Sequence, residues 1–101
     1  MFLAMNRFKI AKGFEPAFEK LWRERESYLD DVDGFQSFSL LKGADEESDY
    51  TLYASHTTWE SEEHFVQWTE SESFKKAHRQ ARAPKGTYLE HPKLELFRSI
   101  L

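Results

Sequence analysis

The amino-acid sequence predicts an α+β fold in which helices cover one face of a sheet. In four segments apolar side chains alternate with a period of two residues, and between these segments they recur every three to four residues. The resulting order is strand, helix, strand, strand, helical pair, strand, which is the split βαβ order of ferredoxin-like domains. The chain has 101 residues and no linker-like stretch, so we expect a single domain over residues 1–101.

The first strand is expected over residues 2–10 and the first helix over residues 14–32. One face of the strand carries Phe2, Ala4, Asn6, Phe8 and Ile10. The apolar stripe of the helix comprises Phe14, Phe18, Leu21, Trp22, Leu29 and Val32. We expect Gly34 to end this helix, because glycine readily adopts the left-handed conformation that follows a last helical turn.

Residues 35–43 and 49–58 alternate again and are expected to form a hairpin across the acidic segment between them. The first of these strands is expected to place Phe35 and Leu41 on one face and Phe38 and Leu40 on the other.

Two short helices and a last strand are expected to follow. Thr58 or Ser61 can cap the first helix, and Ser71 or Ser73 can start the second. The apolar face of the second helix comprises Phe74, Ala77, His78 and Ala81. A last strand at about residues 87–100 places Leu94 and Leu96 opposite Phe97.

Composition and charge exclude several classes of protein. Lys and Arg number 14 and Asp and Glu number 18, and the net charge of −4 argues against a nucleic-acid-binding protein. The absence of cysteine excludes disulfides, thiolate ligands and a cysteine nucleophile. No apolar run approaches the ~20 residues of a transmembrane helix. The first residues do not resemble an export signal, so a cytoplasmic location is expected.

Several predicted strands are apolar on both faces, although the helices can cover only one face of the sheet. We therefore expect the second face to pack against another copy of the chain in a homodimer. Aromatic residues make up 16% of the chain, which is enough to line an apolar pocket in addition to the core.

Two polar side chains interrupt apolar faces and are candidates for a functional site. Asn6 lies in the middle of the first strand's apolar face, where an amide without hydrogen bonds costs about 1–3 kcal/mol. It either bonds to neighbouring backbone, which is the slightly favoured interpretation, or provides a polar group inside an apolar pocket. His78 lies on an apolar helical face, where a histidine is more often a core residue than a ligand.

Two further features also have two interpretations each. Trp68 lies ten residues before His78, and its spacing alone favours a core tryptophan. Residues 75–85 contain no acidic residue and five basic ones, Lys75, Lys76, Arg79, Arg82 and Lys85. Such a run is usually a solvated face, but around a histidine it can also bind the carboxylates of a ligand.

The common catalytic motifs are absent from the sequence: HExxH, GxSxG, a phosphate-binding glycine loop and a dinucleotide fingerprint. The residues alone therefore indicate a dimeric α+β domain with an aromatic pocket.

Three stretches resemble the IsdG-like haem-degrading monooxygenases of the antibiotic-biosynthesis-monooxygenase (ABM) superfamily. They are residues 2–8, residues 58–68 and, most strongly, residues 68–78. The resemblance covers essentially the whole chain and implies a dimeric, ferredoxin-like α+β barrel. It implies a haem oxygenase that binds haem as substrate and cofactor, opens the porphyrin ring with O2 and external electrons, and releases iron.

The resemblance also implies roles for three residues. His78 resembles the proximal ligand of the haem iron, which is a common role of imidazole. Asn6 resembles an amide that forms a hydrogen bond on the opposite side of the haem, near the bound oxygen. Trp68 resembles the bulky side chain that presses on the porphyrin and ruffles it. These three are the candidate catalytic residues.

The residues that would anchor the propionates follow the resemblance less closely. Some relatives carry an arginine at the position of Leu21, which cannot bind a carboxylate. Arg25 remains nearby, and Trp22 provides an aromatic surface. Arg79 and Arg82 are further candidates for haem binding.

Two other functions use the same aromatic pocket. One is a cofactor-independent monooxygenase of the superfamily acting on an aromatic or quinone-like molecule, and the other is a non-enzymatic haem-binding dimer. Since no flavin or nicotinamide motif is present, haem degradation would require an electron-donating reductase or an ascorbate-like reductant.

Overall fold

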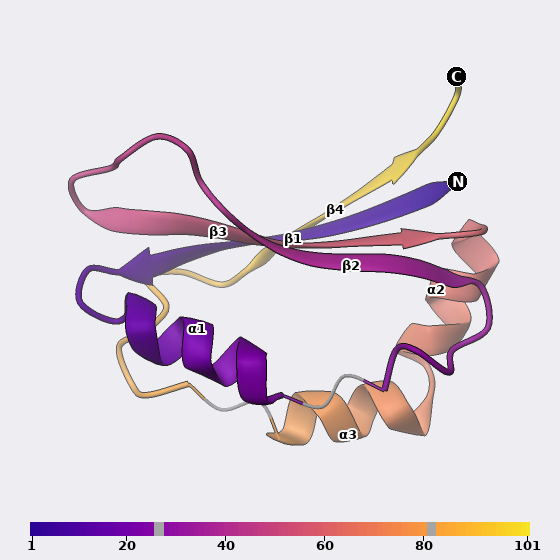
Figure 1. Cartoon of the computed structure of the whole chain (residues 1–101), viewed down its shortest axis with the longest axis horizontal. Helices are drawn as coiled ribbons and strands as arrows, with labels where there is room; N and C mark the ends of the chain where they lie inside the picture. The colour runs from indigo at the N-terminus through magenta and orange to yellow at the C-terminus, as the bar shows by residue number, and fades with distance from the viewer. Residues whose placement is uncertain (26–27, 81–82) are drawn as a thin grey trace.

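The computed structural model describes residues 1–25, 28–80 and 83–101, in which helices lie on one side of an antiparallel sheet (Figure 1). The elements are β1 (Phe2–Ala11), α1 (Glu15–Glu24), β2 (Phe35–Lys42), β3 (Tyr50–Trp59), α2 (Glu62–Thr69), α3 (Glu72–Gln80) and β4 (Lys93–Arg98). The strand order is β2-β3-β1-β4, and neighbouring strands are antiparallel. This arrangement confirms the predicted α+β, ferredoxin-like fold.

Alternate residues of β1 face the helices, and we call this side of the sheet the inner face. Phe2, Ala4, Phe8 and Ile10 are buried there, as the alternation predicts. Asn6 lies on the same face between these two apolar pairs.

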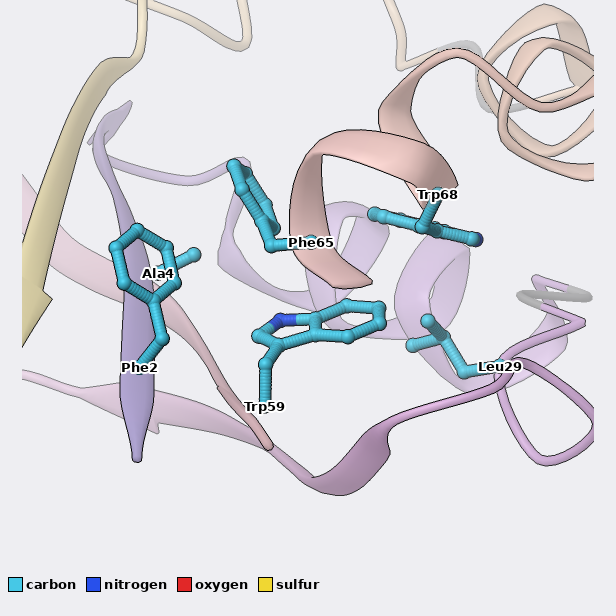
Figure 2. Packing of buried hydrophobic residues seen from close by; sticks show 6 residues of the cluster. All are labelled: Phe2, Ala4, Leu29, Trp59, Phe65 and Trp68. Carbon is cyan, nitrogen blue, oxygen red and sulfur yellow. The ribbon is translucent and has the colours of Figure 1, made fainter. Parts of the chain in front are cut away.

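The buried side chains of the inner face form two clusters at opposite ends of β1. The first cluster comprises Phe2, Ala4, Leu29, Trp59, Phe65 and Trp68. Figure 2 shows Trp59 of β3 beside Phe65 and Trp68 of α2, with ring centroids 5.8 and 5.5 Å from that of Trp59. The second cluster comprises Phe8, Ile10, Phe18 and Tyr53.

Serine side chains start the two paired helices. The Oγ of Ser61 accepts a hydrogen bond from the backbone N–H of His64 at 3.4 Å, so Ser61 rather than Thr58 caps α2. The Oγ of Ser71 accepts one from the N–H of Phe74 at 3.1 Å and so performs the same function for α3.

The prediction of a long first helix was wrong. Helix α1 ends at Glu24, because Arg25 adopts an extended conformation with φ −72° and ψ 132°. Leu29 and Val32 still pack in the first cluster, but they reach it from the connection to β2. Gly34 therefore does not end the helix and instead precedes β2 with φ +80°.

The predicted faces of β2 were partly wrong. A β-bulge lies between Phe35 and Ser37, so the alternation shifts by one residue. Phe35 pairs with Trp59 on the inner face, whereas Leu41 pairs with Ala54 on the opposite, outer face.

The last strand is shorter than predicted. It begins at Lys93, and Tyr88 contributes only an isolated bridge to Ile10. Leu94 and Leu96 lie opposite Phe97, as expected. Ala81, predicted on the face of α3, lies outside the described residues.

The outer face of the sheet is covered by no described helix (Figure 1). It carries Leu3, Met5, Leu41, Ala54 and Phe97. Leu41 and Phe97 are 42% and 50% exposed. None of the helices described is long and apolar enough to cross a membrane.

Candidate functional site

A cavity of about 310 Å³ lies between the inner face and the helices. Its lining includes Ala4 and Trp68 of the first cluster and Phe8 of the second, with Asn6 between them. Most of the lining is apolar or aromatic, and the volume lies at the lower end of the ~300–1,000 Å³ typical of ligand pockets. The gap between the two clusters is thus a cavity whose lining suits an apolar ligand.

Asn6 provides a polar group on the sheet side of this cavity. Its neighbours on the inner face are Ser55, its register partner on β3, and Thr57. Within the described part of the chain, the buried Oδ1 of Asn6 has no hydrogen-bond partner. The interpretation that neighbouring backbone satisfies this atom is therefore not supported, and a polar ligand atom or a water can bind there.

His78 lines the same cavity from α3. Its Nδ1 lies 2.9 Å from the carbonyl oxygen of Phe74, and its ring lies 3.9 Å from the Phe74 ring between centroids. Because a carbonyl only accepts hydrogen bonds, Nδ1 carries the proton and Nε2 keeps its lone pair. Partial burial lowers the pKa of His78, despite the opposing effect of the Phe74 bond, so the ring is neutral at pH 7. A neutral imidazole oriented through its other nitrogen is suited to bind a metal through Nε2.

Trp68 connects the first cluster to the cavity. Its ring centroid lies 5.5 Å from that of Trp59, 4.7 Å from that of Phe74 and 6.4 Å from that of His78. Its buried Nε1 has no partner among the described residues. Trp68 is therefore both a core residue and part of the cavity wall, so the two interpretations of the sequence are compatible.

Trp22 and Arg25 form part of the cavity wall beside α1. The Arg25 guanidinium stacks on the Trp22 ring at 4.4 Å, and its buried Nε has no described partner. Burial lowers the pKa of Arg25, but an arginine remains charged. Leu21 lines the cavity without offering a polar atom. Among the described lining residues, Arg25 is the only formally charged group at pH 7.

The other two arginines predicted for the site remain predictions. Arg79 belongs to α3 with its side chain outside the described part, and Arg82 lies outside the described residues. Tyr88 was missed by sequence reasoning, although it lines the cavity. The sequence analysis placed it inside the predicted last strand of about residues 87–100, which does not reveal which way its ring points.

A second hollow of about 370 Å³ lies behind Trp22 and Phe38. These two rings stack with centroids 5.7 Å apart and also line the first cavity, so they separate the two spaces.

Across the part of the chain that is described, no group of three histidine or acidic side chains is arranged to hold a metal ion. A lone imidazole in an aromatic pocket is instead typical of haem ligation.

The antibiotic biosynthesis monooxygenase family model matches residues 1–80, a range that includes Asn6, Trp68 and His78. The chain belongs to this family. This ABM-family chain is 31% identical over 78 residues to a staphylobilin-producing haem oxygenase of Staphylococcus saprophyticus. The match covers 77% of this chain and 73% of that protein. The corresponding enzyme of Staphylococcus haemolyticus is 32% identical over 82 residues, with the same two coverages.

Solved structures of family members have the same architecture. The haem degrader MhuD from Mycobacterium tuberculosis, solved with two haems in its active site, has a TM-score of 0.75 at 26% identity and covers 100% of this chain and 97% of its own. SnoaB, a cofactor-independent oxygenase from Streptomyces nogalater, has a TM-score of 0.69 at 16% identity and covers 99% and 94%. SnoaB shares the fold alone. Together with the curated relatives, MhuD confirms the resemblance to haem-degrading members of the family.

Proposed function

We propose that this ABM monooxygenase degrades haem, binding it as substrate and as the oxygen-activating group. The observation that carries the proposal is the arrangement of His78 and Asn6 in one apolar cavity. His78 lines it from α3 with Nε2 free to bind a metal, and Asn6 presents an unpartnered amide from the sheet. A flat ligand between the sheet and the helices would have one of these side chains on each side.

The residues that line the cavity fit haem in their chemistry. Nε2 of neutral His78 would hold the iron, and the carbonyl of Phe74 would keep the ring in the required tautomer. The Asn6 amide would bind a polar atom on the opposite side, and Trp68 would limit where the macrocycle can lie. Bound haem supplies the oxygen chemistry, while the protein supplies position and a pocket of low polarity. Electrons come from an external donor in this proposal.

The relatives support the proposal. The curated proteins that match at 31–32% identity are named as haem oxygenases, and MhuD at 26% identity is a haem degrader. The more distant oxygenases share only the fold and do not favour another substrate.

The proposed enzyme is a homodimer formed through the outer face of the sheet. Leu41 and Phe97 are exposed there, and Leu3 and Met5 lie between them on β1. Exposed apolar side chains on a sheet face that no described helix covers are typical of an interface. Size-exclusion chromatography with light scattering is expected to give a particle of two chains, and a particle of one chain would contradict this part of the proposal.

The function is tested by titrating the purified protein with haemin, following the Soret band, and then adding ascorbate in air. The expected result is a saturable Soret band that bleaches to a bilin-like spectrum as iron is released. A stable band that does not bleach would indicate a haem-binding protein without activity. No saturable band, together with oxygen uptake on a quinone-like molecule in metal-free protein, would favour the cofactor-independent monooxygenase.

Two variants test the assigned roles. His78→Ala is expected to lose most haem ligation and all turnover, because no other described histidine lines the cavity. Asn6→Ala is expected to bind haem and turn it over slowly. His64→Ala is a control outside the cavity. Normal turnover by His78→Ala would reject the mechanism, and an unchanged rate in Asn6→Ala would reject the role of that amide.

A further inference from the structure

Tyr88 occupies a fixed position at the cavity wall although it lies outside the regular strands. The backbone carbonyl of Thr87 accepts a hydrogen bond from the N–H of Ala11 at 2.9 Å, and the N–H of Leu89 donates one to the carbonyl of Lys9 at 3.0 Å. Thr87 is fully buried, and its hydroxyl donates to the carbonyl of Pro84 at 2.6 Å. The residues on both sides of Tyr88 are therefore anchored, which fixes the backbone from which its ring reaches the cavity.

Arg25 and Tyr88 lie at the same end of the cavity. The Trp22 ring that supports Arg25 contacts Phe8 and Phe18 at centroid distances of 5.9 and 6.2 Å. The Tyr88 ring contacts the same two phenylalanines at 6.1 and 6.0 Å. The Trp22 ring that supports the guanidinium and the Tyr88 ring thus pack on the same two phenylalanines of the second cluster.

The charge at this end is not balanced by the described part of the protein. Arg25 has a buried Nε without a partner, and none of the described lining residues is an acid. Burial raises the pKa of Tyr88 despite the opposing effect of Arg25, so its hydroxyl is protonated and can donate a hydrogen bond. A cation and a hydroxyl donor that line one apolar pocket are complementary to a carboxylate.

We propose that Tyr88 is a positioning residue that, together with Arg25, holds one carboxylate of the bound ligand. This inference rests on the proposed function and extends it to the orientation of the ligand. Protoporphyrin carries its two carboxylates on one edge, while the rest of its rim is apolar. Holding one carboxylate at Tyr88 and Arg25 would fix the rotation of the macrocycle within its plane, and so would select which carbon bridge faces Asn6.

Binding of iron-free protoporphyrin IX and of its dimethyl ester tests the proposal without turnover. Quenching of tryptophan fluorescence reports binding, because Trp22 and Trp68 line the cavity. The wild-type protein is expected to prefer the acid over the ester by about tenfold or more, which is the effect of a charge-assisted hydrogen bond. Tyr88→Phe is expected to reduce this preference about threefold while leaving the affinity for the ester unchanged.

Two further variants make the test specific. Arg25→Met is expected to abolish most of the preference, and adding Tyr88→Phe to it should have little further effect, since both side chains act on one carboxylate. Tyr50→Phe is the matched control: it removes a phenol whose ring contacts Lys9 outside the cavity, so the preference should not change. Tyr88→Phe should also change the ratio of ring-opened isomers, which a purely structural role would not do.

The possible outcomes separate this inference from the proposed function. If the wild-type protein binds acid and ester equally, or if Tyr88→Phe keeps the full preference, the role of Tyr88 is wrong while haem degradation stands. If neither porphyrin nor haemin binds, the proposed function is wrong and the inference falls with it.

Discussion

The two hydrophobic clusters at the ends of β1 differ in the side chains that shield them from solvent. The first is closed by hydrocarbon and indole surface around Trp59, which is fully buried and donates its Nε1–H to the hydroxyl of Thr57 at 2.9 Å. The second is closed by a polar contact, in which the buried Tyr53 donates its hydroxyl to the Glu19 carboxylate at 2.5 Å. The two clusters share no buried residue, so we expect the space around Asn6 between them to serve ligand binding instead of stability.

The largest expected effects come from emptying either cluster. Trp59→Ala and Phe18→Ala each remove a fully buried ring and are expected to lower the free energy of unfolding by about 3–5 kcal/mol. Urea denaturation measures this loss. Milder changes, Trp59→Phe and Phe18→Leu, are suited to a double-mutant cycle. Their effects should add within about 0.5 kcal/mol if the clusters are independent, and a larger coupling energy would show that they form one core.

Substitution of two glycines is expected to have the next largest effect on the free energy of unfolding. One glycine precedes β2 and the other precedes α1, so they compare the two ends of the molecule. Gly34, before β2, has φ +80°, and an added Cβ would lie 2.2 Å from Cγ of His64. Gly13, before α1, has φ +94° and open space around it. Gly13→Ala is expected to cost about 1–2 kcal/mol for the backbone conformation alone. Gly34→Ala should cost more in thermal or urea unfolding, because the His64 ring must also move.

The double variant separates these two contributions at Gly34. In a His64→Ala background, which removes the ring, Gly34→Ala should cost no more than Gly13→Ala. An undiminished penalty there would mean that backbone strain, and not the contact with His64, makes Gly34 necessary.

Acid sensitivity is expected from the second cluster. The hydrogen bond from Tyr53, with help from the charges of Lys42 and Arg23, lowers the pKa of Glu19 in spite of partial burial. A carboxylate whose pKa is lower in the folded state stabilises the fold above its unfolded pKa of about 4.3, and this contribution is lost as the pH falls through the folded pKa. Tyr53→Phe is expected to cost about 1 kcal/mol at pH 7 and less at pH 3. Equal penalties in urea at both pH values would contradict this origin.

The sequence predicted the first strand better than the connection that follows the first helix. Strict alternation in residues 2–10 indicated both the buried face of β1 and the unusual place of Asn6. The first helix was predicted too long because Leu29 and Val32 continue the helical spacing, yet they reach the core from a loop. A period of apolar residues reports which side chains are buried but not whether the backbone between them is helical.

Apart from the residues that the family resemblance indicated, site residues were predictable where a polar side chain interrupts an apolar pattern. His78 and Asn6 have that signal, and both line the cavity. Tyr88 has none, because it was expected in the last strand, where an aromatic residue is ordinary; only the pairing of residues 87–89 with β1 places it at the cavity. The bulge after Phe35 was equally hidden, since an extra residue in a strand leaves little trace in the sequence.

The smallest expected effect on the free energy of unfolding comes from Asn6, between the two clusters, where a substitution is expected to stabilise the fold. Asn6→Leu replaces a buried, unpartnered amide oxygen with hydrocarbon of similar size, in contact with the cavity walls of both clusters. We expect the free energy of unfolding to rise by about 1 kcal/mol, because burying an unsatisfied polar atom is costly. Asn6→Ala, which removes the amide without filling the space, is the control and should gain less stability.

Haem turnover by Asn6→Leu should fall sharply, since no amide remains across the cavity from His78. A more stable, inactive variant would show that the gap in the core is kept for the ligand at a cost in stability, whereas a less stable one would mean that ordered water already satisfies the amide.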